Sequence, residues 1–331
     1  MTEPSLVGPW VRRFLLEHLV GERNLSVNTQ KSYRDMLMQL LPFIAEHSGK
    51  SVDRLAVADI STKRVRQFLQ HIEAGRHCGA RTRNQRLSAI HALARFIGER
   101  APEHIEWCGQ MRLISFKRTI EPTITCLDRA EMQALLAAPK RSTPQGQRDY
   151  AMLLFLYNSG ARVSEAAALT IADLDYYARS VKILGKGNKW RICPLWPATL
   201  DILRALTVDR TPAARVFLNR NGLSITRSGI HALVKRYARR AAKTVPSLSN
   251  KVIGPHVIRH STASHLLRAG VDINTIRGWL GHVSLDTTNI YAEIDLETKA
   301  KALATCDISG GLRRTRSWRS QPALMEFLHG L

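Results

Sequence analysis

Cysteine is scarce in this sequence and never paired. The 331-residue chain has five cysteines, and no C-x-x-C motif occurs. An odd number of isolated cysteines argues against a disulfide framework and against a zinc site with cysteine ligands. We therefore expect a protein of the reducing cytoplasm. The five are Cys78, Cys108, Cys126, Cys193 and Cys306.

Long apolar runs are also missing. No apolar stretch approaches the roughly 20 residues that a membrane-spanning helix needs. The N-terminal stretch MTEPSLVGPWVRRF lacks the apolar core of a signal peptide. We therefore expect a soluble protein without a membrane partner.

Acidic residues are few compared with basic ones. Asp and Glu number 27 against 49 Lys and Arg, which gives a formal net charge of +22. This excess predicts attraction to a polyanion, and nucleic acid is the commonest one. Ribosomal and other non-specifically basic proteins share the bias, but they are usually shorter and richer in low-complexity tails. Here the basic run is short, LRRTRSWRS at 312–320.

The length of the chain suggests two domains, and 44% hydrophobic residues suffice for packed interiors. Residues 1–107 predict a helical domain. Ser26 is suited to cap one helix, which Gly49 ends, and Ser61 is suited to cap the next.

A third helix is expected in GARTRNQRLSAIHALARFIGER, with an apolar face formed by Leu87, Ile90, Ala94 and Ile97. Its N-terminal half is basic. A solvated surface would account for these charges, but in a chain of this net charge we expect contacts with a DNA backbone. The expected contacts are Arg81, Arg83 and Arg86.

The helical periodicity fades over residues 108–126, which predicts an interdomain linker. A second domain, mostly helical, is expected over 127–305. It opens with a capping box formed by Asp128 and Glu131. Two β-prone runs around GKGNK in RSVKILGKGNKWRICPL predict a hairpin. Residues 306–331 form a tail that the motifs do not explain.

A basic amphipathic helix is predicted in RSGIHALVKRYARRAAK. Its apolar stripe comprises Ile230, Leu233, Val234, Tyr237 and Ala241. The opposite face carries the second set of expected DNA contacts, Lys235, Arg236 and Arg239, next to Arg240.

The stretch HVIRHSTASH at 256–265 carries His256 and His260 four residues apart, like the zinc motif H-E-x-x-H. No carboxylate stands between them, and Arg259 beside a dication would be electrostatically unfavourable. We therefore expect no metal. His256 and Arg259 share a helical face, and Gly254 and Pro255 place His256 at a helix N-terminus. This arrangement suits an anion such as phosphate.

Further cationic and titratable residues lie before and after this stretch. Arg162 lies just beyond a helix expected to end at Gly160, and Lys186 lies at the hairpin tip. His282 follows in WLGH, and Tyr291 follows in TTNIYAEI. Each residue alone is more often a surface charge or a core side chain. His260 and His265 are interpreted as supporting residues, and Glu165 as a residue that orients nearby cations.

Taken together, the motifs SGARVSE, GKGNKWR, PHVIRHSTASHLLRAG, WLGH and TTNIYAEI resemble the tyrosine recombinase (phage integrase) family, especially its bacterial Xer-like and transposon-associated members. The spacing contributes, with 23 residues from Arg259 to His282 and nine more to Tyr291. The resemblance is strong over about 127–300. It is weaker in the N-terminal segment, which fits the family's core-binding domain.

The resemblance implies a mainly α fold, in which a helical core-binding domain and a mostly helical catalytic domain with a small antiparallel sheet clamp duplex DNA. It implies a site-specific recombinase that acts through a 3′-phosphotyrosyl intermediate, in integration, excision or transposition, without a cofactor. Tyr291 would be the nucleophile, and Lys186 the general acid. The implied catalytic set is Arg162, Lys186, His256, Arg259, His282 and Tyr291.

Two alternatives remain beside the recombinase. A type IB topoisomerase would use the same chemistry without strand exchange, and a non-catalytic DNA-binding regulator would have no use for the nucleophile. The expected partners are double-stranded DNA with a specific recombination site, further copies of the chain in a tetrameric synapse, and companion recombinases. The amphipathic end of the tail, PALMEFLHGL, is expected to contact a neighbouring protomer.

Overall fold

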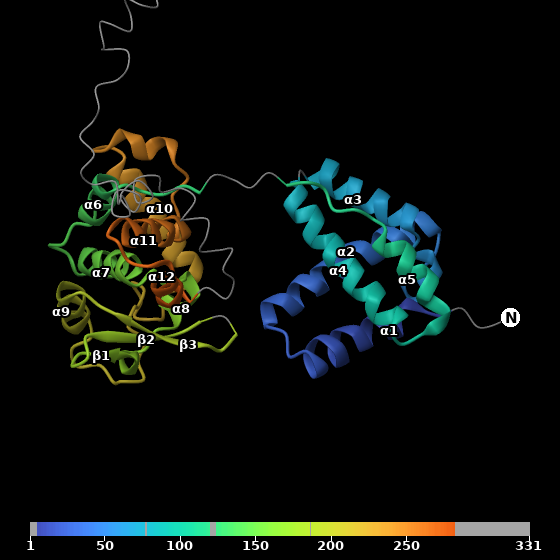
Figure 1. Cartoon of the computed structure of the whole chain (residues 1–331), viewed down its shortest axis with the longest axis horizontal. Coiled ribbons are helices and arrows are strands. Elements are labelled where there is room, and N and C mark those ends of the chain that lie inside the picture. Colours follow the sequence, from blue (N-terminus) through green and yellow to red (C-terminus); the bar gives the residue numbers. More distant parts are fainter. Residues whose placement is uncertain (1–4, 77, 120–123, 186, 282–331) are drawn as a thin grey trace, which may run out of the picture. The chain divides into compact units, whose positions relative to one another are not determined.

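The computed structural model describes residues 5–76, 78–119, 124–185 and 187–281 (Figure 1). The chain divides into two compact units, Met1–Pro122 and Thr123–Leu331, called here the first and second units. The predicted tail, 306–331, lies outside the described residues. No helix in the described ranges is both long and apolar enough to span a lipid bilayer.

The first unit is built from helices, as predicted. Ser26 caps its longest helix by accepting a hydrogen bond from the amide of Thr29, and Gly49 ends that helix at a φ of 62°. A left-handed residue of this kind is usually glycine, because no Cβ opposes it. The elements are α1 (Val7–Arg13), a π-helix η1 (Phe14–Glu22), α2 (Val27–Ser48), α3 (Thr62–Arg76), α4 (Ala80–Gly98) and α5 (Ile105–Arg112), with short 3₁₀ turns at Val52–Arg54, Val57–Asp59 and Pro102–His104.

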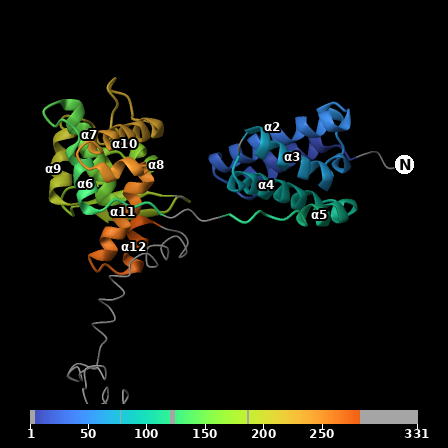
Figure 2. The same ribbon diagram turned by 90° about the horizontal axis from the view of Figure 1, so that it is seen from above.

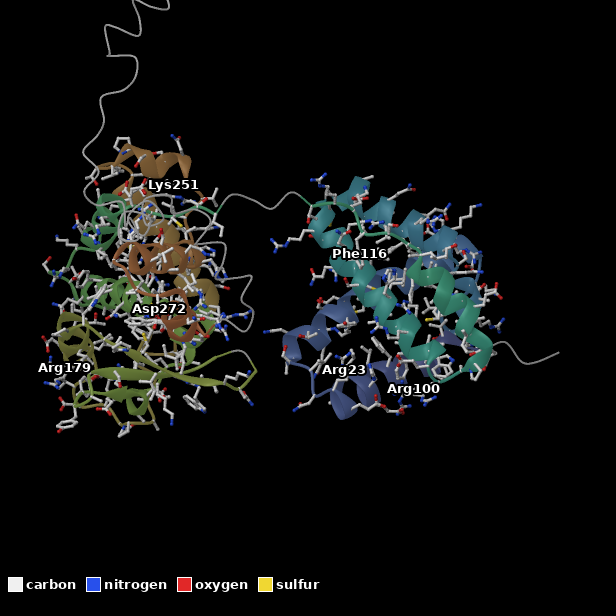
Figure 3. All side chains as sticks on the ribbon, in the orientation of Figure 1. Arg23, Arg100, Phe116, Arg179, Lys251 and Asp272 are labelled. Carbon is white, nitrogen blue, oxygen red and sulfur yellow. The ribbon has the colours of Figure 1, made fainter. Side chains whose placement is uncertain are left out.

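The core of the first unit contains the apolar positions that the periodicity predicts. Leu87, Ile90, Ala94 and Ile97 of α4 are all buried. They pack in one cluster with apolar residues of α2 and α3. At the surface, Arg100, which is labelled in Figure 3, pairs with Glu22 of η1 at 2.6 Å.

The boundary between the units differs from the predicted linker over 108–126. Residues 108–112 belong to α5, and Met111 and Ile114 are buried in the core of the first unit. On the other side, Leu127 is buried in the second unit, and its amide donates to Ser261 Oγ at 2.8 Å. The periodicity fades because α5 is short and buries few side chains, so the linker is shorter than predicted.

The described part of the second unit is mostly helical and contains one small sheet, which confirms the predicted fold class. Asp128 and Glu131 form the predicted capping box at the start of α6. The hairpin strands pair antiparallel with Val181 opposite Cys193, in a sheet of order β1-β2-β3. The elements are α6 (Arg129–Ala137), α7 (Pro144–Ser159), α8 (Val163–Ala168), β1 (Leu174–Asp175), β2 (Ser180–Leu184), β3 (Trp190–Pro194), α9 (Pro197–Leu206), α10 (Arg227–Ala241), α11 (Pro255–Arg268) and α12 (Ile273–Leu280), with 3₁₀ turns at Ile171–Asp173 and Pro246–Asn250.

Helix α11 lies between α10 and α12 (Figures 1 and 2) and also packs against α7. Nine of its residues are buried, so most of its circumference contacts protein. Helix α12 in turn packs against both α11 and β3. Asp272 (Figure 3) caps α12 by accepting hydrogen bonds from the amides of Asn274 and Thr275. Elements that are distant in sequence therefore meet around α11 and α12.

Candidate active site

Arg259 of α11 is a buried arginine that links two helix ends. Only 4% of its surface is exposed. Its Nη1 donates to the carbonyl of Gly160 at 2.6 Å, and its Nη2 to the carbonyl of Leu280 at 2.7 Å. Gly160 ends α7 at a φ of 59°, and a Cβ added there would lie 2.4 Å from Leu280 Cδ2. Glycine is therefore required where α7 meets α12.

Arg162 lies two residues beyond Gly160, at the start of α8. Its Nη2 donates to the carbonyl of Gly281 at 3.2 Å, and its Nη1 to Glu165 Oε1 at 2.9 Å. A quarter of its side chain is exposed. Arg162 and Arg259 therefore bind consecutive carbonyls at the C-terminus of α12, where the helix dipole favours cations.

His256 is the second residue of α11, so the prediction that it lies at a helix N-terminus is confirmed. It lines a hollow of about 270 Å³ together with Arg162, whose other walls are Val163, Ser164, Arg227, Ser228 and His231. The pKa of His256 lies below 6.5, first because protein atoms displace water around the ring, and then because Arg259, His231 and Arg162 add positive charge. A neutral imidazole beside two arginines can accept a proton while the cations hold an anion.

Arg227 and His231 are two residues of this hollow that the sequence interpretation missed. Both belong to α10, whose buried stripe matches the prediction. Nδ1 of His231 lies 3.9 Å from where a Cβ on Gly254 would stand, which places it beside the start of α11. Nothing in the spacing of α10 reveals that its first two turns face α11, so the sequence held no signal for these residues.

The other two histidines of HVIRHSTASH, His260 and His265, do not line the hollow. His265 is buried, and its Nδ1 is 2.8 Å from the Tyr157 hydroxyl. Burial lowers the pKa of His260 to about 4, with smaller contributions from His256 and Arg259. This placement agrees with the interpretation of both as supporting residues.

Three residues of the implied catalytic set, Lys186, His282 and Tyr291, lie outside the described residues. The predicted hairpin that carries Lys186 is present. In sequence, Lys186 follows Gly185 and His282 follows Gly281, and both glycines are described. Of the six, the structure therefore brings Arg162, His256 and Arg259 together.

The expected DNA contacts of the first unit differ in exposure. Arg81 is exposed at the start of α4. Arg83 is buried, and its Nη1 donates to the carbonyl of Ser115 at 2.8 Å. Arg86 donates to the carbonyl of Ser32 at 3.3 Å and is partly buried. Arg83 therefore joins α4 to the segment after α5, an arrangement that helical spacing alone does not reveal.

The expected contacts of the second unit lie on the exposed face of α10. Lys235, Arg236 and Arg239 line a shallow depression there, together with Ala232, Arg240 and Lys243. Arg236 also pairs with the buried carboxylate of Asp149 at 2.6 Å. It therefore has a structural partner in addition to its solvent-exposed surface.

Comparison with known proteins bears on what this site does. The profile of the Phage integrase family matches residues 125–297, more than half of the chain, and that of the phage integrase N-terminal SAM-like domain matches residues 12–100. The chain belongs to the phage integrase family. Members of this integrase family are tyrosine recombinases, enzymes that exchange DNA strands.

Relatives of this integrase extend over the whole chain. The "Putative integrase/recombinase y4rC" of Sinorhizobium fredii is 34% identical over 334 residues, covering 100% of both proteins. "Tyrosine recombinase XerC" of Roseiflexus castenholzii is 32% identical over 293 residues, covering 86% of this chain and 88% of the relative. The resemblance inferred from the motifs is therefore confirmed.

Solved structures share the fold of this integrase. The Tn1549 transposon integrase in complex with transposon right end DNA matches with a TM-score of 0.68 at 16% identity, covering 89% of this chain and 99% of that one. XerH site-specific recombinase bound to difH substrate matches with a TM-score of 0.63 at 21% identity, covering 88% of this chain and 83% of that one. The family match and the relatives named as integrases and tyrosine recombinases favour neither the topoisomerase nor the non-catalytic alternative.

Proposed function

We propose that this chain is a site-specific recombinase whose reacting phosphate binds in the hollow lined by Arg162 and His256. The supporting observation is that Arg162 and Arg259 converge on consecutive carbonyls beside that hollow. Arg162 donates to one carbonyl and to Glu165, and Arg259 donates to two carbonyls, so both guanidinium groups are held in place and keep their positive charge beside the hollow. Two such cations stabilise the charge that develops on the phosphate in the transition state.

The chemical step follows from this arrangement and from the family resemblance. The Tyr291 oxygen attacks the phosphorus, a P–O bond to tyrosine forms, and the bond to the 5′-oxygen breaks. A tyrosine with an ordinary pKa of about 10 needs a base to attack at neutral pH. His256 takes the tyrosine proton, Lys186 gives a proton to the leaving 5′-oxygen, and His282 hydrogen-bonds the phosphate.

The reverse step rejoins the DNA. The 5′-hydroxyl of a partner strand attacks the phosphotyrosyl link and releases Tyr291. The link preserves the energy of the phosphodiester, so no ATP is consumed. Exchange requires two DNA sites, for which we propose a tetrameric synapse of this chain, with companion recombinases where the two sites differ. The setting proposed is the cytoplasm, and the biological outcome is integration, excision or transposition.

The proposed DNA surface comprises basic side chains of α10 and α4. On α10 these are Lys235, Arg236 and Arg239, and on α4 Arg81 and Arg86. The burial of Arg83 suits it to hold α4 in place rather than to bind DNA directly. Neutralising many phosphates releases counterions, so affinity is expected to fall steeply with salt.

Covalent trapping tests the proposed reaction and identifies the target site in the same experiment. A pool of nicked duplexes that contains the DNA flanking the gene and random sequences is incubated with the protein. The nick makes the strand that carries the released 5′-hydroxyl short enough to diffuse away. Without that hydroxyl the reverse step cannot occur, and the covalent intermediate accumulates. Denaturing purification and sequencing then identify DNA bound covalently to wild type and absent with Tyr291→Phe. An adduct that survives Tyr291→Phe, or none with wild type, would overturn the proposal.

The recovered site then separates recombination from DNA relaxation. Two labelled duplexes carrying that site should yield recombinant products, whereas a type IB topoisomerase would relax supercoiled plasmid without exchange. We also propose that residues 306–331 contact a neighbouring protomer. A chain truncated after residue 305 should bind one site but fail to pair two, and paired complexes from that chain would refute this contact.

A further inference from the structure

Arg191 of β3 is a buried arginine close to the proposed phosphate site. Its side chain is 8% exposed. Nη2 donates to Glu165 Oε2 at 2.6 Å, and Nε to the carbonyl of Trp279 at 2.9 Å. Nη1 is buried and has no hydrogen-bond partner in the described structure. Burying such a donor is costly, so stability alone does not account for an arginine at this position.

Two glycines flank the Arg191 guanidinium. A Cβ added to Gly185 would lie 3.3 Å from Nη1. One added to Gly281 would also lie 3.3 Å from Nη1, and 3.1 Å from Cδ. In sequence these glycines immediately precede Lys186 and His282. Arg191 thus lies beside the backbone that leads into two residues of the proposed catalytic set.

Glu165 connects Arg191 to Arg162. Its Oε1 accepts from Arg162 Nη1 at 2.9 Å, and its Oε2 accepts from the Arg162 amide at 2.8 Å and from Arg191. Burial alone would raise the pKa of Glu165, but the hydrogen bond and charge of Arg191, followed by the contacts of Arg162, hold it below 4.5. One buried anion therefore serves two guanidinium groups.

We propose that Arg191 is a positioning residue for catalysis, acting through Glu165 on Arg162 and through Trp279 on the end of α12. This inference rests on the proposed function. With Arg191 in place, Glu165 is largely neutralised, and the positive charge of Arg162 remains effective toward a phosphate. Without Arg191, Glu165 has Arg162 as its remaining charge partner in the described structure, so Arg162 attracts phosphate less.

Single-turnover adduct formation on the trapped site tests this role. Arg191→Met should slow adduct formation about 100-fold, a loss typical of electrostatic groups, while the Kd for DNA changes less than about threefold because Arg191 is buried. Arg191→Lys should restore part of the rate, because it returns a charge without the fork geometry. Lys182→Met, on the exposed face of β2, is the matched control and should react like wild type.

A second variant separates positioning from simple support of the fold. In Glu165→Gln with Arg191→Met, both members of the buried pair become neutral, so the double variant should fold. If Glu165 without Arg191 silences Arg162, this double variant should react at least about 10-fold faster than Arg191→Met alone. If Arg191→Met does not fold, the double variant is compared with Arg191→Lys and wild type. It should then react at least as fast as Arg191→Lys.

Three results would overturn the inference once wild type forms an adduct that Tyr291→Phe lacks. One is a rate of adduct formation for folded Arg191→Met that lies within about threefold of the wild-type rate, because loss of an electrostatic group should slow the reaction about 100-fold. Another is a double variant no faster than Arg191→Met or, where that variant does not fold, slower than Arg191→Lys. The third is a loss confined to Kd. Absence of any wild-type adduct instead refutes the proposed function.

Discussion

Arg162 and Arg259 start from different parts of the chain and donate to consecutive carbonyls, those of Gly281 and Leu280. Arg191 donates to the preceding carbonyl, that of Trp279. Three cations therefore gather at the last turn of α12, where carbonyls without a donor inside the helix carry partial negative charge. The end of α12 fixes where these guanidinium groups stand relative to one another.

The two proposed clamp arginines should differ in what their loss costs the fold. Arg162→Gln and Arg259→Gln should each lower adduct formation by about 100- to 1000-fold. Arg259→Gln should also reduce the free energy of unfolding by about 2 kcal/mol, because two buried carbonyls lose their donor. Arg162 is partly exposed, so its replacement should cost less than about 1 kcal/mol. Urea unfolding followed by circular dichroism measures the difference, and equal costs would contradict the geometry.

The rate of adduct formation should fall on the acid side as His256 becomes protonated. Because its pKa is lowered, the fall should be centred below pH 6.5. His231→Ala removes one positive neighbour, which stabilises the protonated ring and raises the pKa of His256. The acid limb should therefore move to higher pH, as single-turnover rates across pH 5 to 8 would show. An unchanged limb would mean that His256 is not the base or that His231 does not act on it.

His260 should make the protein less stable in acid. Folding lowers its pKa from 6.5 to about 4, so the unfolded chain binds a proton first as the pH falls. The contribution is present above pH 6.5 and is lost as the pH falls toward 4. After allowance for partial solvent access, the loss is about 2 kcal/mol. His260→Gln should flatten this part of the stability profile, and an unaltered profile would show that another group causes the acid loss.

Substitutions at two neighbouring basic residues of α10, Lys235 and Arg236, should have similar effects on DNA affinity but different effects on stability. Lys235→Gln should lower DNA affinity and reduce the salt slope by about one, with unchanged unfolding. Arg236→Gln should do the same and also cost about 1 kcal/mol, because Asp149 is fully buried and loses one of its partners. Arg148 and Tyr237 still contact Asp149 in that variant. Filter binding at several salt concentrations measures the affinity, and urea unfolding measures the stability. If Arg236 acts only on DNA, Arg236→Gln and Lys235→Gln will unfold alike, which would contradict the prediction.

The sequence predicts those features that depend on local order. Helix caps at Ser26 and Asp128, the apolar stripe of α10 and the GKGNK hairpin are all encoded within a few residues, and each is confirmed. Motif order also led to the family. By contrast, the roles of Arg83, Arg191 and His231 depend on which elements pack together. Arg83 resembles any other basic residue at the start of a helix until Ser115 is found beside it.

The boundary of the first unit shows the same limit. Residues 108–112 lack a clear periodicity, yet they form the end of α5, because Met111 is buried by helices that lie earlier in the chain. A short helix with few buried positions carries too little pattern to be distinguished from a linker. Tertiary packing, rather than propensity, determines its structure.

The close approach of Gly160 to Leu280 limits where relatives of this chain can gain or lose residues. Because a Cβ at Gly160 would meet the Leu280 side chain, and Arg259 bridges the carbonyls of both residues, the register of α12 at Leu280 is constrained by its neighbours. One inserted residue would turn the end of α12 by about 100° and misdirect three carbonyls together. Sequence drift can alter the exposed face of α12 freely, but insertions and deletions there should be rare among active members.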